Sequence, residues 1–245
     1  MLVLLPPSET KRPGGVGVSV DRAAIIWAAL DPARQMVIDS LLKLCADPDL
    51  AAKRLKLGKK SIGDIAANLE IMTSGTMPAL RRYTGTLYDA LGFETLSEQA
   101  IKRASDQLFI QSALFGLVPA MEQIPYYRLS AGTSLPGVVL AEIWKEAHAA
   151  VWPRLEGEVL DMRSKAYVAI NPVSETKTTY FVEVLDAGSG RALNHFNKKA
   201  KGAFARSILE NGMEQIGDAE AVAAKAGLAV RLDGKRLELL VPKGF

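Results

Sequence analysis

Twice in this chain an apolar run, predicted to be a buried strand, stops at a proline and is followed by Ser-Glu-Thr-Lys. The first run covers residues 2–5 and its loop holds Ser8 and Lys11; the second covers residues 166–170 and its loop holds Ser174 and Glu175. Polar groups at the ends of buried strands line the crevices where mixed sheets commonly bind ligands. The repeat therefore favours two ligand-binding loops on a sheet. The alternative is that each serine only caps a turn and the match is chance.

The remaining pattern predicts helices first and strands later. Asp31-Pro32 begins an amphipathic helix, Gly92 ends another in which Tyr83 and Leu87 share a face, and Ser97 caps the next. A further helix is expected to start near Asp21. Residues 108–117 are a buried strand or a buried helix, which periodicity does not separate. Residues 180–185 form a strand, and Asp233-Gly234 joins a hairpin.

These elements predict an α+β protein, with one domain over residues 1–245 and a mixed sheet surrounded by helices. With 49% apolar residues the chain has enough material for a large core. No window has the roughly 18 apolar residues of a membrane span, and Pro6-Pro7 interrupt the first apolar run too early for a secretory signal. The single cysteine, Cys45, indicates a reduced, cytosolic setting.

Metal and cofactor sites are not expected. The two histidines, His148 and His195, lie far apart in the sequence and match no spacing of metal ligands. With one cysteine and no His-x-x-Glu pattern, we predict neither a protein-built zinc or iron site nor a bound cofactor.

A cationic helix is predicted for residues 197–211. No acidic residue lies between Asp186 and Glu210, and Gly202 falls near the centre of the basic side of this helix. A glycine there lowers helix stability by roughly 1 kcal/mol relative to alanine, so we expect it to admit a phosphate or another backbone. The alternative is a solvated face with an incidental glycine. The cations of this segment are Lys198, Lys199, Lys201 and Arg206.

Two other basic segments have less definite patterns. Residues 53–60 contain several lysines with scattered apolar residues, which is typical of a solvated surface. Tyr126, Tyr127 and Arg128 precede a glycine, and such a group can stack on bases and pair with phosphates. It can equally be a core aromatic beside a surface arginine.

Five blocks of the sequence resemble the YaaA family of bacterial peroxide-stress proteins and follow the family's order. They are LVLLPPSETK, YTGTLYDAL, SALFGLVPAMEQIPYYRLSAGTSLPG, VAINPVSE and NKKAKGAFARSILEN. The resemblance implies a cytoplasmic protein that protects against hydrogen peroxide by restraining free iron and that binds double-stranded DNA. It also implies an α+β fold with a positively charged cleft and a helix-hairpin-helix element. Here the matching hairpin contains Gly92, Phe93, Thr95 and Leu96.

We therefore predict one cleft in which the two Ser-Glu-Thr-Lys loops face the cationic helix around an anionic ligand. Its phosphate-binding residues would be Ser8, Lys11, Arg128, Ser174, Lys198, Lys199, Lys201, Gly202 and Arg206. The leading ligand is duplex DNA, bound without sequence preference. The alternative is an enzyme that binds a nucleotide or another phosphorylated small molecule, with Ser174 and Glu175 as its catalytic candidates and an unknown reaction. Direct chelation of iron is a third possibility, and no membrane partner is expected.

Overall fold

The computed structural model describes residues 1–17, 19, 27–193 and 196–245. The helix expected near Asp21 lies outside the described residues, as does His195. The descriptions below refer to the described residues alone.

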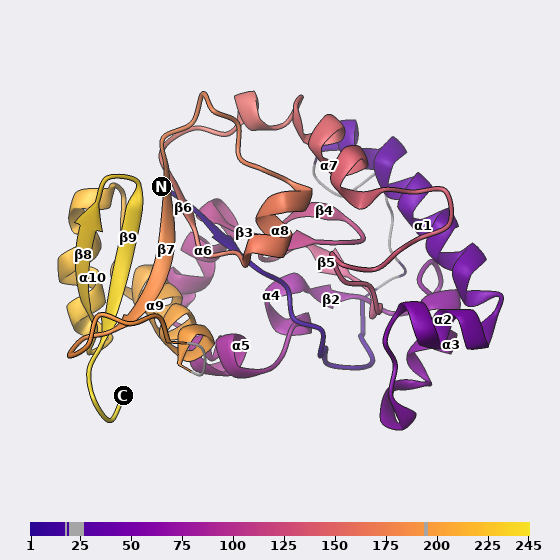
Figure 1. The fold of residues 1–245 in the computed structure, drawn as a ribbon, viewed down its shortest axis with the longest axis horizontal. Helices are drawn as coiled ribbons and strands as arrows, with labels where there is room; N and C mark the ends of the chain where they lie inside the picture. The colour runs from indigo at the N-terminus through magenta and orange to yellow at the C-terminus, as the bar shows by residue number, and fades with distance from the viewer. Residues whose placement is uncertain (18, 20–26, 194–195) are drawn as a thin grey trace.

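Within these residues, seven strands form one mixed sheet in the order β4-β3-β1-β6-β7-β9-β8 (Figure 1). Five neighbouring strands, from β3 to β9, run parallel, and β4 and β8 pair antiparallel at the two edges. The strands are β1 Leu2–Leu5, β3 Leu108–Ser112, β4 Gly116–Pro119, β6 Val159–Asp161, β7 Thr179–Asp186, β8 Ala229–Asp233 and β9 Arg236–Val241. A separate antiparallel pair consists of β2 Met77–Pro78 and β5 Gln123–Ile124.

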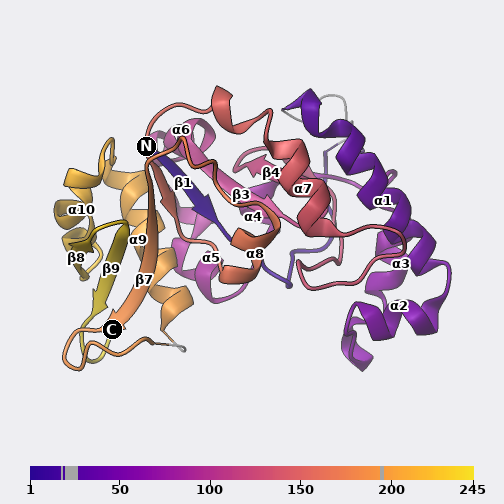
Figure 2. The same ribbon diagram turned by 45° about the horizontal axis from the view of Figure 1, so that its top comes forward.

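Helices surround this sheet, so the predicted fold class is confirmed. Figure 1 and Figure 2 both place α1–α3 and α7 toward one end of the molecule and α10 with β8 toward the other. The helices are α1 Asp31–Cys45, α2 Pro48–Arg54, α3 Asp64–Leu69, α4 Ala79–Arg82, α5 Thr86–Leu91, α6 Glu98–Gln107, α7 Leu140–His148, α8 Lys165–Ile170, α9 Asn197–Asn211 and α10 Ala219–Lys225. The short 3-10 turns are η1 Ala28–Leu30, η2 Lys59–Ser61, η3 Phe93–Thr95, η4 Trp152–Arg154 and η5 Ile216–Asp218.

Strand β1 is buried on both faces of the sheet. Successive side chains of a strand point to opposite faces, and accordingly Val3 and Leu5 join the larger apolar cluster while Leu2 and Leu4 join a smaller one around Trp152. Burial on both sides explains why all four residues of the strand are apolar. It also places the carboxyl end of β1 inside the molecule, between β3 and β6.

Several local predictions are confirmed. Helix α1 starts at Asp31 and α9 ends at Asn211, followed by Gly212. The β8–β9 hairpin turns between Asp233 and Arg236. The buried segment whose type was left open is strand β3, a turn and strand β4.

Two local predictions are wrong. Residues 166–170 were expected as a strand and belong to helix α8, because the amides of Tyr167 and Val168 bond the Ser164 carbonyl and close a helical turn. Tyr83 was placed on the face of the helix that ends at Gly92. It lies instead in extended backbone between α4 and α5, with φ −75° and ψ 141°.

No helix of the described part of the chain is both long and apolar enough to cross a membrane.

Candidate nucleic-acid interface

Residues 92–96, the predicted hairpin segment, form the turn between α5 and α6, which is called the hairpin turn below. Helix α5 ends at Gly92, which adopts the left-handed conformation (φ 66°) that glycine tolerates best and that turns the chain sharply. The 3-10 turn η3 follows, and the Ser97 hydroxyl then caps α6 by accepting a hydrogen bond from the Ala100 amide at 3.1 Å. Local sequence thus determines both helix ends and the turn between them.

Helix α9 supports the hairpin from inside the molecule, and Gly202 makes this contact possible. A Cβ atom at Gly202 would lie 2.1 Å from the Leu87 carbonyl oxygen and 2.9 Å from the Ala90 Cβ. No real Cβ approaches another backbone so closely, so only glycine allows α9 and α5 to pack at this separation. Gly202 is therefore buried against another backbone, which was one of its two predicted uses, and does not border a phosphate site.

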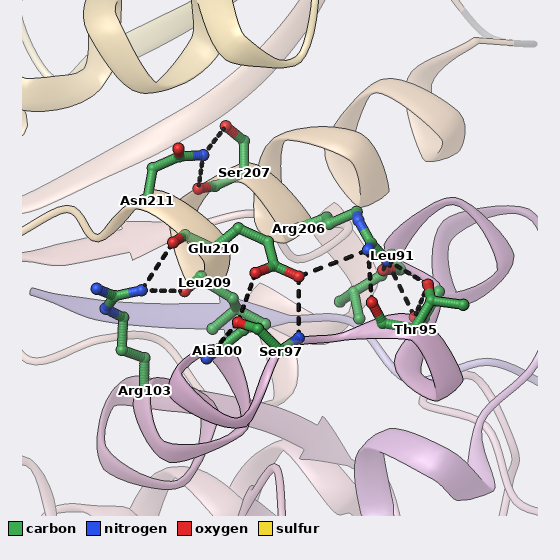
Figure 3. Close-up of polar contacts among 11 residues, drawn as sticks. Leu91, Thr95, Ser97, Ala100, Arg103, Arg206, Ser207, Leu209, Glu210 and Asn211 are labelled. Atoms are coloured by element: carbon green, nitrogen blue, oxygen red, sulfur yellow. Dashed lines mark hydrogen bonds and ion pairs between the residues drawn. The ribbon is translucent and has the colours of Figure 1, made fainter.

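Arg206, one turn further along α9, binds the hairpin turn (Figure 3). Its Nη1 donates to the carbonyls of Leu91 (2.9 Å) and Gly92 (3.1 Å) and to the Thr95 hydroxyl (2.9 Å). Its Nη2 donates to the Thr95 carbonyl at 2.8 Å. Both terminal nitrogens of the guanidinium are thus bound to the turn, so Arg206 positions the hairpin turn.

The orientation of these carbonyls fixes the orientation of a neighbouring amide. In a trans peptide the C=O and N–H groups point in opposite directions, and the described chain has no cis peptide. Because the Gly92 carbonyl faces Arg206, the Phe93 N–H points away from α9. Among the described residues, neither the Phe93 nor the Glu94 amide has a hydrogen-bond acceptor. The Phe93 amide is therefore a free donor on the side of the turn that faces away from α9.

The amino end of α6 is not free in the same way. The Glu210 carboxylate accepts hydrogen bonds from the Ser97 amide (3.2 Å) and the Ser97 hydroxyl (2.6 Å), as Figure 3 shows. The Ser97 hydroxyl, foremost, holds the pKa of Glu210 below its ordinary value, so this group stays ionised. An internal carboxylate thus occupies the position that a helix N-terminus offers to an anion. The turn, and not the amino end of α6, is the part of the hairpin open to a ligand.

The loop after β1 and helix α4 border the hairpin turn, and each adds one cation. Arg12 and Arg81 lie 3.4 Å and 2.9 Å from the Glu94 carboxylate, with side chains 45% and 41% exposed. Between this loop and the turn lies a pocket of about 140 Å³. It is lined by Arg12, Leu80, Arg81, Tyr83, Thr84, Tyr88, Asp89, Gly92, Phe93, Glu94 and Thr95.

The two Ser-Glu-Thr-Lys loops do not meet, contrary to our expectation. Strands β1, β6 and β7 are parallel, with Leu2 opposite Val159 and Val159 opposite Thr179. Ser8 follows the carboxyl end of β1, whereas Ser174 and Glu175 precede the amino end of β7. The loops therefore lie at opposite ends of the parallel strands, and Lys177 in the second loop donates to the Leu155 carbonyl near the amino end of β6. An active site that combines Ser174 and Glu175 with Ser8 is excluded by this geometry.

The remaining predicted cations have different surroundings. Lys198 and Lys199 are exposed on the first turn of α9, and Lys199 also lies over the Phe245 ring at 4.8 Å. Lys201 is buried and donates to the Met162 carbonyl at 3.0 Å; burial lowers its pKa to about 8. The lysines of residues 53–60 are exposed, as predicted.

Lys11 and Arg128 lie together at the carboxyl end of β1. Arg128 forms an ion pair with Glu9 at 2.8 Å, and Lys11 is buried beside Tyr127 and Tyr83. Two tyrosines precede Arg128. Tyr127 is a core residue, while the half-buried Tyr126 donates to Asp64 at 2.8 Å. Both tyrosines are thus used inside the protein.

Sequence reasoning missed Arg12, Glu94 and Glu210. Arg12 directly follows the first Ser-Glu-Thr-Lys motif, so the cationic loop could have been extended by one residue. Glu94 lies within the predicted hairpin, where an acid opposes phosphate binding and was therefore overlooked. Nothing in the sequence indicates that Glu210 reaches Ser97, which is far away along the chain. Among the described residues, no group of three or more His, Cys, Asp or Glu side chains is placed to hold a metal.

Comparison with known proteins gives a consistent result. Residues 1–231 match the family model described as peroxide stress protein YaaA. A UPF0246 protein of Streptomyces coelicolor is 39% identical over 241 residues, covering 96% of this chain and 93% of its own. A UPF0246 protein of Corynebacterium efficiens is 36% identical over 247 residues, covering 98% of each chain. A more distant UPF0246 protein, from Shewanella woodyi, is 27% identical over 234 residues, covering 88% of this chain and 89% of its own.

Proposed function

The chain belongs to the peroxide stress protein YaaA family, and from this premise we propose a cytoplasmic protein that binds double-stranded DNA at the hairpin turn. The contacts would be to phosphates and would carry little sequence information. The proposal includes restraint of free iron, which the resemblance to the family implies. The observation that supports DNA binding best is the turn itself, whose Phe93 and Glu94 amides have no partner among the described residues.

The chemistry of the turn suits a phosphate. Backbone N–H groups are strong donors that bind phosphate oxygens without reading the bases. Arg206 fixes the turn by four hydrogen bonds, so the Phe93 amide is already oriented and needs no reorganisation on binding. Arg12 and Arg81 on the adjacent surface supply the positive charge that a turn of neutral amides lacks.

Glu94 must give way for this contact to form. Its carboxylate now lies against both arginines, in the place where a phosphate oxygen would be bound. The Glu94 side chain is 51% exposed, and ion pairs in such positions contribute only about 0–1 kcal/mol. A DNA phosphate that approaches the turn can therefore displace it at small cost.

The salt dependence of binding tests the proposal. We expect the affinity for a short labelled duplex to fall as salt rises, with a slope of log K against log salt of about −0.9 per neutralised phosphate. Two arginines then predict a slope of about −2 or steeper. A second duplex of unrelated sequence serves as the control and should bind within a few-fold. An affinity that stays flat with salt, or a strong preference for one sequence, contradicts phosphate binding of this kind.

A further inference from the structure

The carboxyl end of β1 is a second place where the fold favours a ligand, distinct from the hairpin turn. Strand β1 lies between β3 and β6, and the chain leaves β1 for β3 on one side and later returns to β6 on the other. In open sheets of parallel strands, ligands commonly bind outside the carboxyl ends at such a point of divergence. The residues that follow β1 here are those of the first Ser-Glu-Thr-Lys loop, which ends in Lys11.

Lys11 is a buried amine that forms no ion pair with a carboxylate of the described residues. It is 7% exposed, and its Nζ donates to the carbonyls of Ser8 (2.9 Å) and Glu9 (3.4 Å). The nitrogen lies 4.3 Å from the ring centroid of Tyr127 and 5.4 Å from that of Tyr83. Burial, and after it the charge of Arg128, lowers the pKa of Lys11 to about 7. A large fraction of this amine is therefore neutral and nucleophilic at physiological pH.

The tyrosine rings beside Lys11 belong to a buried hydroxyl network. The Tyr127 hydroxyl is hydrogen-bonded to the Tyr83 hydroxyl at 2.7 Å and to the Ser112 hydroxyl at 2.8 Å. Tyr88 donates to the Pro6 carbonyl at 2.7 Å, on the same loop. Burial raises the pKa of Tyr83 and Tyr127 far above neutrality, so both phenols keep their protons. The rings over which the amine lies thus carry a connected set of neutral hydroxyl groups.

An ion pair between Glu9 and Arg128 lies on the solvent side of Lys11. The Glu9 side chain is 65% exposed, and the Arg128 side chain is 14% exposed. Such a pair is weak because one partner is largely in water. When Glu9 swings outward, the guanidinium of Arg128 becomes available to an anion directly beside Lys11.

We propose that Lys11 forms a Schiff base with a small anionic carbonyl compound, an aldehyde or ketone that carries a carboxylate or phosphate bound by Arg128. The lone pair of Nζ attacks the carbonyl carbon and gives a carbinolamine. The carbinolamine then loses water, which takes the carbonyl oxygen and both amine hydrogens, and leaves a C=N bond to Nζ. The neutral phenols near the amine supply protons for the departure of water. No oxidant or reductant is required, and the step does not depend on DNA binding.

Reductive trapping tests this proposal on the intact protein. The protein is incubated with glyoxylate, an aldehyde that carries a carboxylate, then reduced with borohydride, digested and mapped by mass spectrometry. We expect Lys11 to be labelled at least tenfold faster at pH 7 than the exposed Lys53 and Lys198, because lysines of ordinary pKa are almost fully protonated there. Labelling of Lys11 should be half-maximal near pH 7. The charged and titratable groups around the amine are Glu9, Asp64, Arg82, Tyr83, Tyr127 and Arg128.

Lys201 is the matched control within the chain. It is equally buried, at 7% exposed, but its Nζ bonds the Met162 carbonyl and lies beside no arginine-bound anion site. We expect little label on Lys201. Tyr127→Phe keeps the ring under Lys11 and should slow labelling by severalfold without unfolding the protein. Labelling of Lys11 no faster than that of Lys53, or equal labelling of Lys11 and Lys201, overturns the proposal.

Discussion

Burial has opposite effects on the reactivity of Cys45 and of Lys11. Cys45 is buried, and burial raises the pKa of its thiol despite a hydrogen bond from Asn68. Reaction of a cysteine with peroxide requires an accessible thiolate. Cys45 is therefore a core residue, and thiol chemistry is not the basis of a peroxide-stress role for this chain. The same physical effect of burial lowers the pKa of Lys11 to about 7, so that a large fraction of this amine is neutral near pH 7.

His148 makes stability depend on pH. Its Nε2 accepts from the Leu117 amide at 3.0 Å while Nδ1 bonds the Trp144 carbonyl at 2.7 Å, so the ring is neutral, and burial lowers its pKa to about 3. The unfolded state takes up a proton near pH 6.5 and the folded state does not. The stabilisation is therefore complete above pH 6.5 and is lost as pH falls toward 3, by about 1.4 kcal/mol per pH unit in that window.

Urea denaturation at several pH values checks this expectation. The free energy of unfolding should fall between pH 6.5 and pH 4 in the wild-type protein. His148→Gln should be less stable at pH 7, and its stability should change less over the same range. A wild-type stability that is unchanged from pH 6.5 to pH 4 contradicts the assignment of a neutral, buried imidazole.

At the scale of elements, the contact between α5 and α9 is set by a single glycine. Helix propensity alone predicts that Gly202→Ala stabilises the protein by about 1 kcal/mol. Because the new methyl group would overlap the Leu87 carbonyl, we expect instead a net loss of about 1–3 kcal/mol in the free energy of unfolding. Gly63→Ala is the control, since Gly63 has helical backbone angles and open space around it. Chemical denaturation of both variants tests this expectation. A Gly202→Ala protein more stable than the wild type would contradict the close packing of α5 against α9.

The elements also show what the sequence could and could not predict. The starts of α1 and α6 and the end of α9 follow from local signals, such as Ser97 as a cap and Gly212 after the last helical residue, and these three were predicted. Helix α8 was taken for a strand because six residues are too few to establish a period. That error had a larger consequence for the site. A strand over residues 166–170 would place Ser174 after a carboxyl end. Ser174 instead precedes β7 and so lies at the amino end of that strand.

At the scale of the whole molecule, contacts between distant segments build the site. Arg206, in the last quarter of the chain, binds the carbonyls of the hairpin turn. Arg12, near the start of the chain, adds positive charge to the exposed surface beside that turn. The sequence predicted the hairpin and the cationic helix as separate features but not their contact, because local periodicity contains no information about which helices pack together. A second contact of this kind joins Arg163 to Gln111 on β3, with the Arg163 Nη1 donating to the Gln111 Oε1 at 3.3 Å. Arg163 also bonds the carbonyl of Asn171 and thereby fixes the turn after α8.

The most direct test of the hairpin turn as the DNA contact is the affinity of Glu94→Gln for a duplex at low salt. Removal of this carboxylate frees Arg12 and Arg81, so binding should become roughly two- to fivefold tighter, in line with an exposed ion pair of up to about 1 kcal/mol. Glu142→Gln on α7 makes the same change in net charge at another exposed position and should alter the affinity much less. An equal gain in both variants, or no gain in Glu94→Gln, would contradict the assignment of this turn as the DNA-binding surface.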